Sequence, residues 1–180
     1  MHKIKHIPII LFSILLSFTF FSCSSTKNVS NNSSISKSEL KLILKAEKQA
    51  DKDGKKVLAE GRNLALNKKA IIPGSCWNWI NTVYNNAGYP NKNGKRETIF
   101  KGKKKGPYAK SKTIKAGDWL YFINHSYNNI EHSGIFVYWV DYRKKTGMIL
   151  SYGGESRKQP GRYKVYDLRH VYNIIRPSSK

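Results

Sequence analysis

The segment PGSCWNWINTVYNNAG, residues 73–88, is the stretch around which the rest of the chain is organised. Pro73 and Gly74 interrupt the segment before it, and Ser75 is a residue type that caps helix N-termini. Gly88 is a typical residue just after a helix C-terminus. Between these marks, residues recur every three or four positions, as they do on one face of a helix: Cys76, Ile80, Val83, Tyr84 and Ala87. The pattern predicts a short helix that begins at Cys76.

The position of Cys76 at a helix start has a chemical consequence. Unpaired backbone N–H groups and the positive end of the helix dipole favour the anionic form of a thiol there. The sulfur is then nucleophilic near neutral pH. The alternative interpretation is a small buried apolar side chain that only packs.

Length and charge limit the classes of protein to consider. The 180 residues suit one compact domain with an N-terminal extension. With 33 Lys and Arg against 11 Asp and Glu, the formal net charge is +22. This balance indicates anionic surroundings such as nucleic acid, phospholipid headgroups or acidic cell-wall polymers. The two cysteines, Cys23 and Cys76, are too few for a disulfide framework.

The N-terminus has the layout of a secretory signal over residues 1–22, with two lysines followed by an apolar run over 7–21. Its end, Phe20-Phe21-Ser22-Cys23, resembles a bacterial lipoprotein signal, although Phe20 stands where leucine is usual. The resemblance implies that Cys23 is lipidated and anchors the chain to a membrane, with the domain outside the cytoplasm. The alternative is an ordinary signal peptide with an incidental cysteine.

The chain after the signal divides into a tether and helical segments. Residues 23–38 are rich in Ser, Asn and Lys and predict a flexible tether. A helical pattern follows over 39–56, with Gly54 expected to interrupt it after about Asp53. A second amphipathic segment, Val57–Leu66, opens the main domain, which we expect over 57–180.

In the second half of the chain, a polar segment is followed by segments whose residue types predict strands. Residues 89–115 predict a solvated loop, with KGKKKG at 101–106 as its most charged part. A basic rim that holds an anionic polymer is the alternative, whereas the lack of interleaved aromatic residues argues against nucleic acid as a partner. Five strands are expected after it, over 119–123, 132–140, 147–152, 163–168 and 171–175, with the second and third forming a hairpin. Helices followed by an antiparallel sheet predict an α+β fold.

Three histidines lie beyond the signal, His125, His132 and His170. A nucleophilic thiolate needs a base within hydrogen-bond reach, and that base needs a third group to orient it. His132 begins a predicted strand at the rim of the sheet, where a helix N-terminus can meet it. His125 and His170 lie in polar connections and are expected at the surface.

These residues together resemble the NlpC/P60 group of papain-like cysteine peptidases and amidases. The likeness covers about residues 57–176 and rests on Gly74-Ser75-Cys76 before a helix, on Lys115-Ala116-Gly117-Asp118 before an aromatic strand, and on His132-Ser133-Gly134-Ile135. It implies a papain-like α+β fold, with helices packed on a five-stranded antiparallel sheet. It also implies Cys76 as nucleophile and His132 as base.

The resemblance places a polar third residue at the end of the strand that pairs with the histidine strand. That position falls on Ser151, with Glu155 as the alternative. Many wall-degrading members carry an Asp directly before the cysteine, whereas this chain has Ser75. Ser75 and Trp77 are the expected substrate-binding residues, because Trp77 and Trp79 cannot both face the core and one of them is free to line the cleft.

The function expected from the sequence is cysteine-dependent hydrolysis of an amide bond in the bacterial cell envelope, with peptidoglycan peptides as substrate. The Cys76 backbone N–H and a neighbouring donor would stabilise the oxyanion. No cofactor and no metal are expected, because the Cys and His spacing offers no ligand set. Two alternatives stay open: a non-catalytic lipoprotein that binds anionic wall polymers or a partner, and a lipid acyl hydrolase or transferase on the same fold.

Overall fold

The computed structural model describes residues 35–179. The expected signal over 1–22, the lipidation site Cys23 and most of the expected tether lie outside the described residues. The described α-helices are α1 (Lys37–Gln49), α2 (Lys52–Arg62), which continues as a π-helical turn over Asn63–Asn67, and α3 (Cys76–Asn86). The strands are β1 (Arg96–Lys101), β2 (Trp119–Asn124), β3 (Ile130–Asp141), β4 (Thr146–Ser151), β5 (Arg162–Asp167) and β6 (Val171–Pro177).

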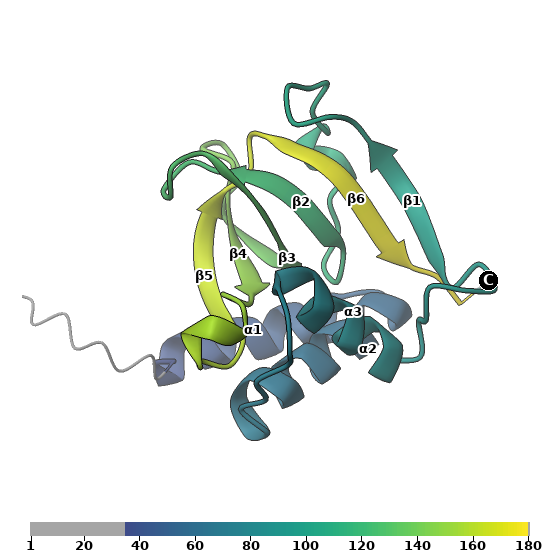
Figure 1. Ribbon diagram of the computed structural model, residues 1–180, viewed down its shortest axis with the longest axis vertical. Helices are drawn as coiled ribbons and strands as arrows, with labels where there is room; N and C mark the ends of the chain where they lie inside the picture. The colour runs from purple at the N-terminus through teal and green to yellow at the C-terminus, as the bar shows by residue number, and fades with distance from the viewer. Residues whose placement is uncertain (1–34, 180) are drawn as a thin grey trace, which may run out of the picture. The chain divides into compact units, whose positions relative to one another are not determined.

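The strands form one antiparallel sheet in the order β1-β6-β2-β3-β4-β5, and the three helices gather on one side of it (Figure 1). The predicted α+β class is confirmed, as is the hairpin of β3 and β4. The predicted strand number is wrong, because the sheet has six strands instead of five. The additional strand β1 lies inside the segment predicted as a loop, where it pairs with β6 at the edge of the sheet.

The break between the first two helices differs from the prediction. The helix α1 ends at Gln49, and Asp51 caps α2 by accepting a hydrogen bond from the Gly54 N–H at 2.8 Å. Gly54 therefore lies within α2 instead of interrupting a helix. A Cβ atom at this position would stand 2.2 Å from the carbonyl oxygen of Ala116, so the glycine allows α2 to approach the turn before β2. Gly117 faces Gly54 across this contact and has a φ of +93°.

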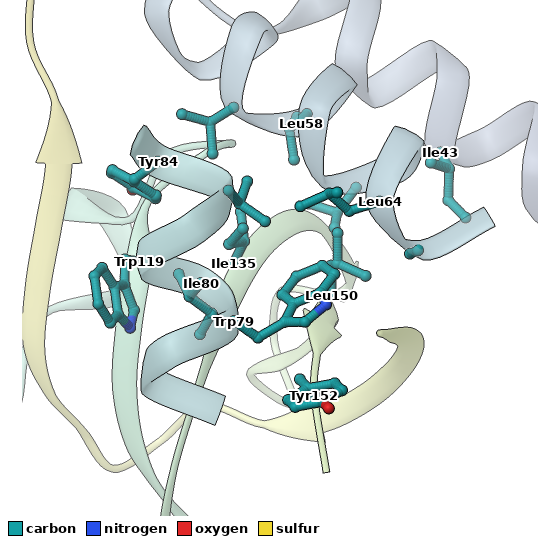
Figure 2. Packing of buried hydrophobic residues seen from close by; sticks show 14 of the residues in the cluster. Ile43, Leu58, Leu64, Trp79, Ile80, Tyr84, Trp119, Ile135, Leu150 and Tyr152 are labelled. Atoms are coloured by element: carbon teal, nitrogen blue, oxygen red, sulfur yellow. The ribbon is translucent and has the colours of Figure 1, made fainter. Parts of the chain in front are cut away.

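Apolar side chains cover both faces of the sheet. One cluster fills the space between the helices and the sheet, and Figure 2 shows Trp79 and Ile80 of α3 against Leu150 and Tyr152. The other face carries a second buried cluster that includes Phe122, Phe136 and Ile149. Because both faces are apolar near the middle of the sheet, alternation of polar and apolar residues does not mark which side of β3 faces the helices.

The segment Lys115–Asp118 has a structural role. Asp118 is buried, and its carboxylate accepts a hydrogen bond from the Lys115 N–H at 2.7 Å. The Arg176 guanidinium of β6 donates to both carboxylate oxygens at 2.8 Å. Burial raises the pKa of Asp118, while the hydrogen bonds from Arg176 and Lys115 act against this shift. The Asp118 carboxylate therefore links the start of β2 to β6.

Candidate functional site

Cys76 begins α3, as the sequence predicts. The Ser75 side chain accepts a hydrogen bond from the Trp77 N–H at 3.2 Å and donates to the Asn78 side chain at 3.1 Å. Ser75 is thus occupied in capping the helix, and Cys76 stands half-buried in its first turn. Of the two tryptophans in this turn, Trp79 is fully buried and Trp77 is 43% exposed.

Glu155 holds the turn that precedes Cys76. One of its carboxylate oxygens accepts a hydrogen bond from the Gly74 N–H at 2.8 Å, and its own N–H donates to the Gly74 carbonyl at 2.9 Å. Gly74 has a φ of +96°, which favours glycine, and an added Cβ would stand 2.5 Å from the Asn78 side chain. Glu155 is therefore a residue that positions the Cys76 turn, and it does not contribute to orienting the His132 ring.

The partner of the Cys76 thiol is Ser133. The Ser133 hydroxyl donates to Cys76 Sγ at 3.4 Å, and Ser133 itself is buried in β3. Tyr121 lies directly opposite Ser133 on β2, and Trp77 hydrogen-bonds its side chain. Burial raises the pKa of Tyr121, so its hydroxyl stays protonated at neutral pH. Among the described residues, the sulfur therefore has a hydroxyl group as its hydrogen-bond partner.

His132 lies on the opposite face of β3. The pairing of β2 with β3 is unbroken from Trp119↔Ile135 to Asn124↔Ile130, so neighbouring residues along β3 point to opposite faces. The His132 ring contacts Phe122 and Tyr166, with ring centroids 5.6 Å and 5.5 Å away. The expected pair of Cys76 thiol and His132 imidazole is therefore not formed, because the backbone of β3 stands between the two side chains.

Ser151 is on the same side of the sheet as His132 and reaches it through a third residue. The Ser151 hydroxyl lies 3.2 Å from the Tyr166 hydroxyl, which lies 3.4 Å from His132 Nε2. Burial lowers the pKa of His132 to about 4, and the positive charges of Arg162, Lys164 and Arg157 act in the same direction. The imidazole is therefore neutral at neutral pH.

Three cations surround this histidine, and we call Arg157, Arg162 and Lys164 the cationic patch. Arg162 pairs with Ser151 across β4 and β5, and alternation along β5 puts Lys164 and Tyr166 on the same face. Lys164 Nζ lies 5.5 Å from the Tyr166 ring centroid. Within residues 35–179, no carboxylate lies within 4.0 Å of the charged groups of the patch. Sequence reasoning missed this patch, because its members are charged residues of the kind found on any strand that faces solvent.

The other two histidines meet each other, although they are far apart in sequence. His125 Nε2 lies 2.5 Å from His170 Nδ1, and His125 Nδ1 lies 2.8 Å from the Asn129 side-chain oxygen. They line a hollow of about 610 Å³ together with Glu131 and Lys104, which form an ion pair. Nothing in the sequence pattern indicates this pairing, since the two residues lie on different connections.

The described part of the chain has neither a cluster of metal-binding side chains nor a membrane-spanning helix. No group of three or more His, Cys, Asp or Glu side chains within residues 35–179 is arranged to hold a metal ion. None of the helices in this range combines the length and the apolar character needed to cross a membrane.

Comparison with known proteins assigns no family. No protein-family model matches the chain, and no curated protein sequence matches it either. The resemblance to NlpC/P60 proteins thus rests on the motif residues alone, and two of these, Gly117 and Asp118, have the packing roles described above.

Proposed function

We propose that the domain binds an anionic polymer of the cell envelope through the cationic patch. The observation that carries this proposal is the set of three cations on one surface without a carboxylate partner within 4.0 Å among the described residues. Positive charges of this kind repel one another, and an anionic ligand relieves that repulsion.

The surroundings of the patch favour a ligand with both charged and apolar parts. Tyr127 is 51% exposed, and the Arg157 guanidinium lies 5.8 Å from its ring centroid. The neutral His132 ring adds no positive charge to the patch, and its Nε2 lies 3.4 Å from the Tyr166 hydroxyl. Acidic wall polymers present repeated anionic groups between less polar units, so they suit this combination of cations and rings.

The test compares two variants that lose the same charge. The patch variant carries Arg157→Gln, Arg162→Gln and Lys164→Gln. The α1 variant carries Lys41→Gln, Lys45→Gln and Lys48→Gln, at exposed positions of another element. Titration with poly(glycerol phosphate) should show affinity at least about tenfold weaker for the patch variant, since each close ion pair contributes about 1 kcal/mol in water. Equal weakening by both variants would show that binding depends on net charge alone and would exclude the patch.

Cysteine-dependent amide hydrolysis is a second candidate function. It is favoured by Cys76, which stands half-buried at a helix N-terminus with a hydroxyl donor on its sulfur. Because His132 lies across β3, this reaction would need a different base. Release of peptides from peptidoglycan should stop with Cys76→Ala and continue with His132→Ala. Equal release from wild type and Cys76→Ala would exclude this function.

The cellular place of the domain is part of the proposal. We infer from the signal over residues 1–22 and from Cys23 that the domain is held at a bacterial membrane, outside the cytoplasm. An anionic wall polymer would then be within reach of the cationic patch.

A further inference from the structure

We propose that the solvent face of α1 docks on anionic phospholipid headgroups of the membrane to which the chain is anchored. This proposal rests on the proposed envelope location, and it concerns a surface distinct from the cationic patch. The docking surface consists of Lys37, Lys41, Lys45 and Lys48 with the flanking Leu42 and Leu44.

The four lysines share one stripe of the helix. Positions three and four residues apart lie on the same face of a helix, and the spacing of the lysines is four, four and three. All four are exposed, while Ile43 and Ala46 point into the core on the other side. The helix is therefore anchored to the domain along one side and presents ammonium groups along the other.

The acidic residues of α1 do not neutralise the stripe. Glu39 is used at the helix start, where its side chain accepts a hydrogen bond from the Ser36 N–H at 3.1 Å. Glu47 accepts from the Arg62 guanidinium at 2.8 Å and so faces α2. Within residues 35–179, no carboxylate lies within 4.0 Å of the stripe lysines. An anionic surface is thus the complementary partner for this face.

Two leucines beside the stripe favour a lipid surface over a soluble anion. Leu42 is 49% exposed and Leu44 is 42% exposed, and helical spacing puts them on opposite flanks of the lysines. Lysine stems and apolar side chains both gain by entering the boundary between headgroups and acyl chains, while the ammonium groups stay among the phosphates.

The place of α1 in the chain brings it to the membrane. Lys37 lies 14 residues after Cys23, and a chain of that length reaches at most about 50 Å when fully extended. The first helix of the domain is thus held near the bilayer if Cys23 carries a lipid. A basic surface beside a lipid anchor adds electrostatic attraction to anionic headgroups, about 1 kcal/mol for each lysine near the membrane surface.

The experiment measures vesicle binding without the lipid anchor. The probe protein is the mature chain from residue 23 onward with Cys23→Ser, which retains all the described helices and strands. Vesicles consist of phosphatidylcholine with or without phosphatidylglycerol, and binding is measured by co-sedimentation. We expect binding only to the vesicles with phosphatidylglycerol, with a partition coefficient reduced about a hundredfold or more in the α1 variant, which corresponds to about 1 kcal/mol for each lysine.

The matched control is the patch variant, which loses the same charge and should keep most of the vesicle binding. Leu42→Ser with Leu44→Ser should weaken vesicle binding while leaving binding to soluble poly(glycerol phosphate) unchanged. Equal loss in the α1 and patch variants, absence of wild-type binding to anionic vesicles, or dimerisation of the chain through α1 in light scattering would each overturn the proposal. The docking proposal predicts that the α1 variant loses vesicle binding, whereas the polymer-binding proposal predicts that the patch variant loses polymer binding. Failure of one proposal can therefore be distinguished from failure of the other.

Discussion

Ser133 and His132 are neighbours in β3, and one step along the strand decides which of them meets the thiol. Ser133 points toward the N-terminus of α3 and donates to Cys76 Sγ, whereas His132 points into the apolar environment of Phe122 and Tyr166. Since two side chains on opposite faces of a strand cannot exchange places by rotamer changes, this assignment is a fixed property of the fold.

The assignment predicts how fast Cys76 reacts with an alkylating reagent. The Ser133 hydroxyl stabilises an anionic sulfur by hydrogen bonding, so Ser133→Ala should slow alkylation about threefold to tenfold. His132→Ala should leave the rate unchanged. The measurement uses iodoacetamide on the mature chain with Cys23→Ser, in which Cys76 is the only thiol. A slower rate in His132→Ala and a wild-type rate in Ser133→Ala would reverse the assignment of faces.

The environment of His132 predicts a dependence of stability on pH. Burial and the neighbouring cations lower the pKa of His132 to about 4, against 6.5 for an ordinary histidine. The unfolded chain therefore binds more protons than the folded chain between these values, and the free energy of unfolding falls as pH drops from 6.5 to about 4. With allowance for partial exposure to solvent, the loss should be about 2 kcal/mol.

Urea unfolding across this pH range measures the effect. His132→Gln should flatten the curve, because glutamine does not titrate in this range. A wild-type slope in His132→Gln would show that His132 is not the group responsible.

At the scale of single residues, the sequence predicted positions better than it predicted partners. The caps of α3 at Ser75 and Gly88 follow from local backbone chemistry and are found as expected. The partner of Cys76 was missed, because β3 carries Ile135, Phe136 and Val137 in succession and is apolar on both faces. Its sequence alone thus contains no signal for the side on which His132 lies.

At the scale of elements, a pair of glycines sets how closely α2 approaches the sheet. Gly54 and Gly117 meet at the turn before β2, and a Cβ at Gly117 would stand 2.4 Å from the Gly54 Cα. The contact depends on backbone atoms, which cannot move aside as flexible side chains do. It therefore fixes the position of α2 relative to β2.

A methyl group at this contact should be costly. Gly54→Ala should lower the free energy of unfolding by about 1 to 3 kcal/mol through overpacking, although alanine is the better helix former. Lys55→Ala, at an exposed position of the same helix, should change it by less than about 0.5 kcal/mol. Chemical denaturation of both variants measures the difference, and a more stable Gly54→Ala variant would contradict the close approach.

The strands were predicted correctly where their residue types strongly favour β-structure. Strands β2 to β6 follow from aromatic and β-branched runs, and they are found close to the expected ranges. The edge strand β1 was missed because its sequence, RETIFK, is half charged and lies among lysines and glycines. Charged residues are common on edge strands, where they oppose pairing with another chain, so this kind of strand lacks a strong sequence signal.

At the scale of the whole molecule, the distribution of the positive charge is more informative than the net charge of +22. The cationic patch and the lysine stripe of α1 lie on different elements, and each lacks carboxylate partners within 4.0 Å among the described residues. We expect the first to hold a polymer and the second to hold a lipid surface. The net charge alone does not indicate that two separate surfaces carry these two roles.

The proposed lipid anchor at Cys23 leads to a prediction about labelling of the N-terminus. In a bacterial host, labelled palmitate should be incorporated into the wild-type chain and into Cys76→Ala. Label should be absent from Cys23→Ala, which removes the proposed acceptor thiol. Label retained in Cys23→Ala would show that the signal is not of the lipoprotein type.

The position of β6 bears on how the protein is made. This strand is the last of the sheet in the chain, yet it lies between β1 and β2 and brings Arg176 to the buried Asp118. The chain must therefore be synthesised as far as β6 before the sheet can close, since until then Asp118 lacks its counter-charge and β1 and β2 lack the strand that pairs with both. A chain whose sheet closes late stays unfolded for longer during synthesis. A protein-conducting channel requires an unfolded chain for translocation, so late closure is compatible with passage through such a channel.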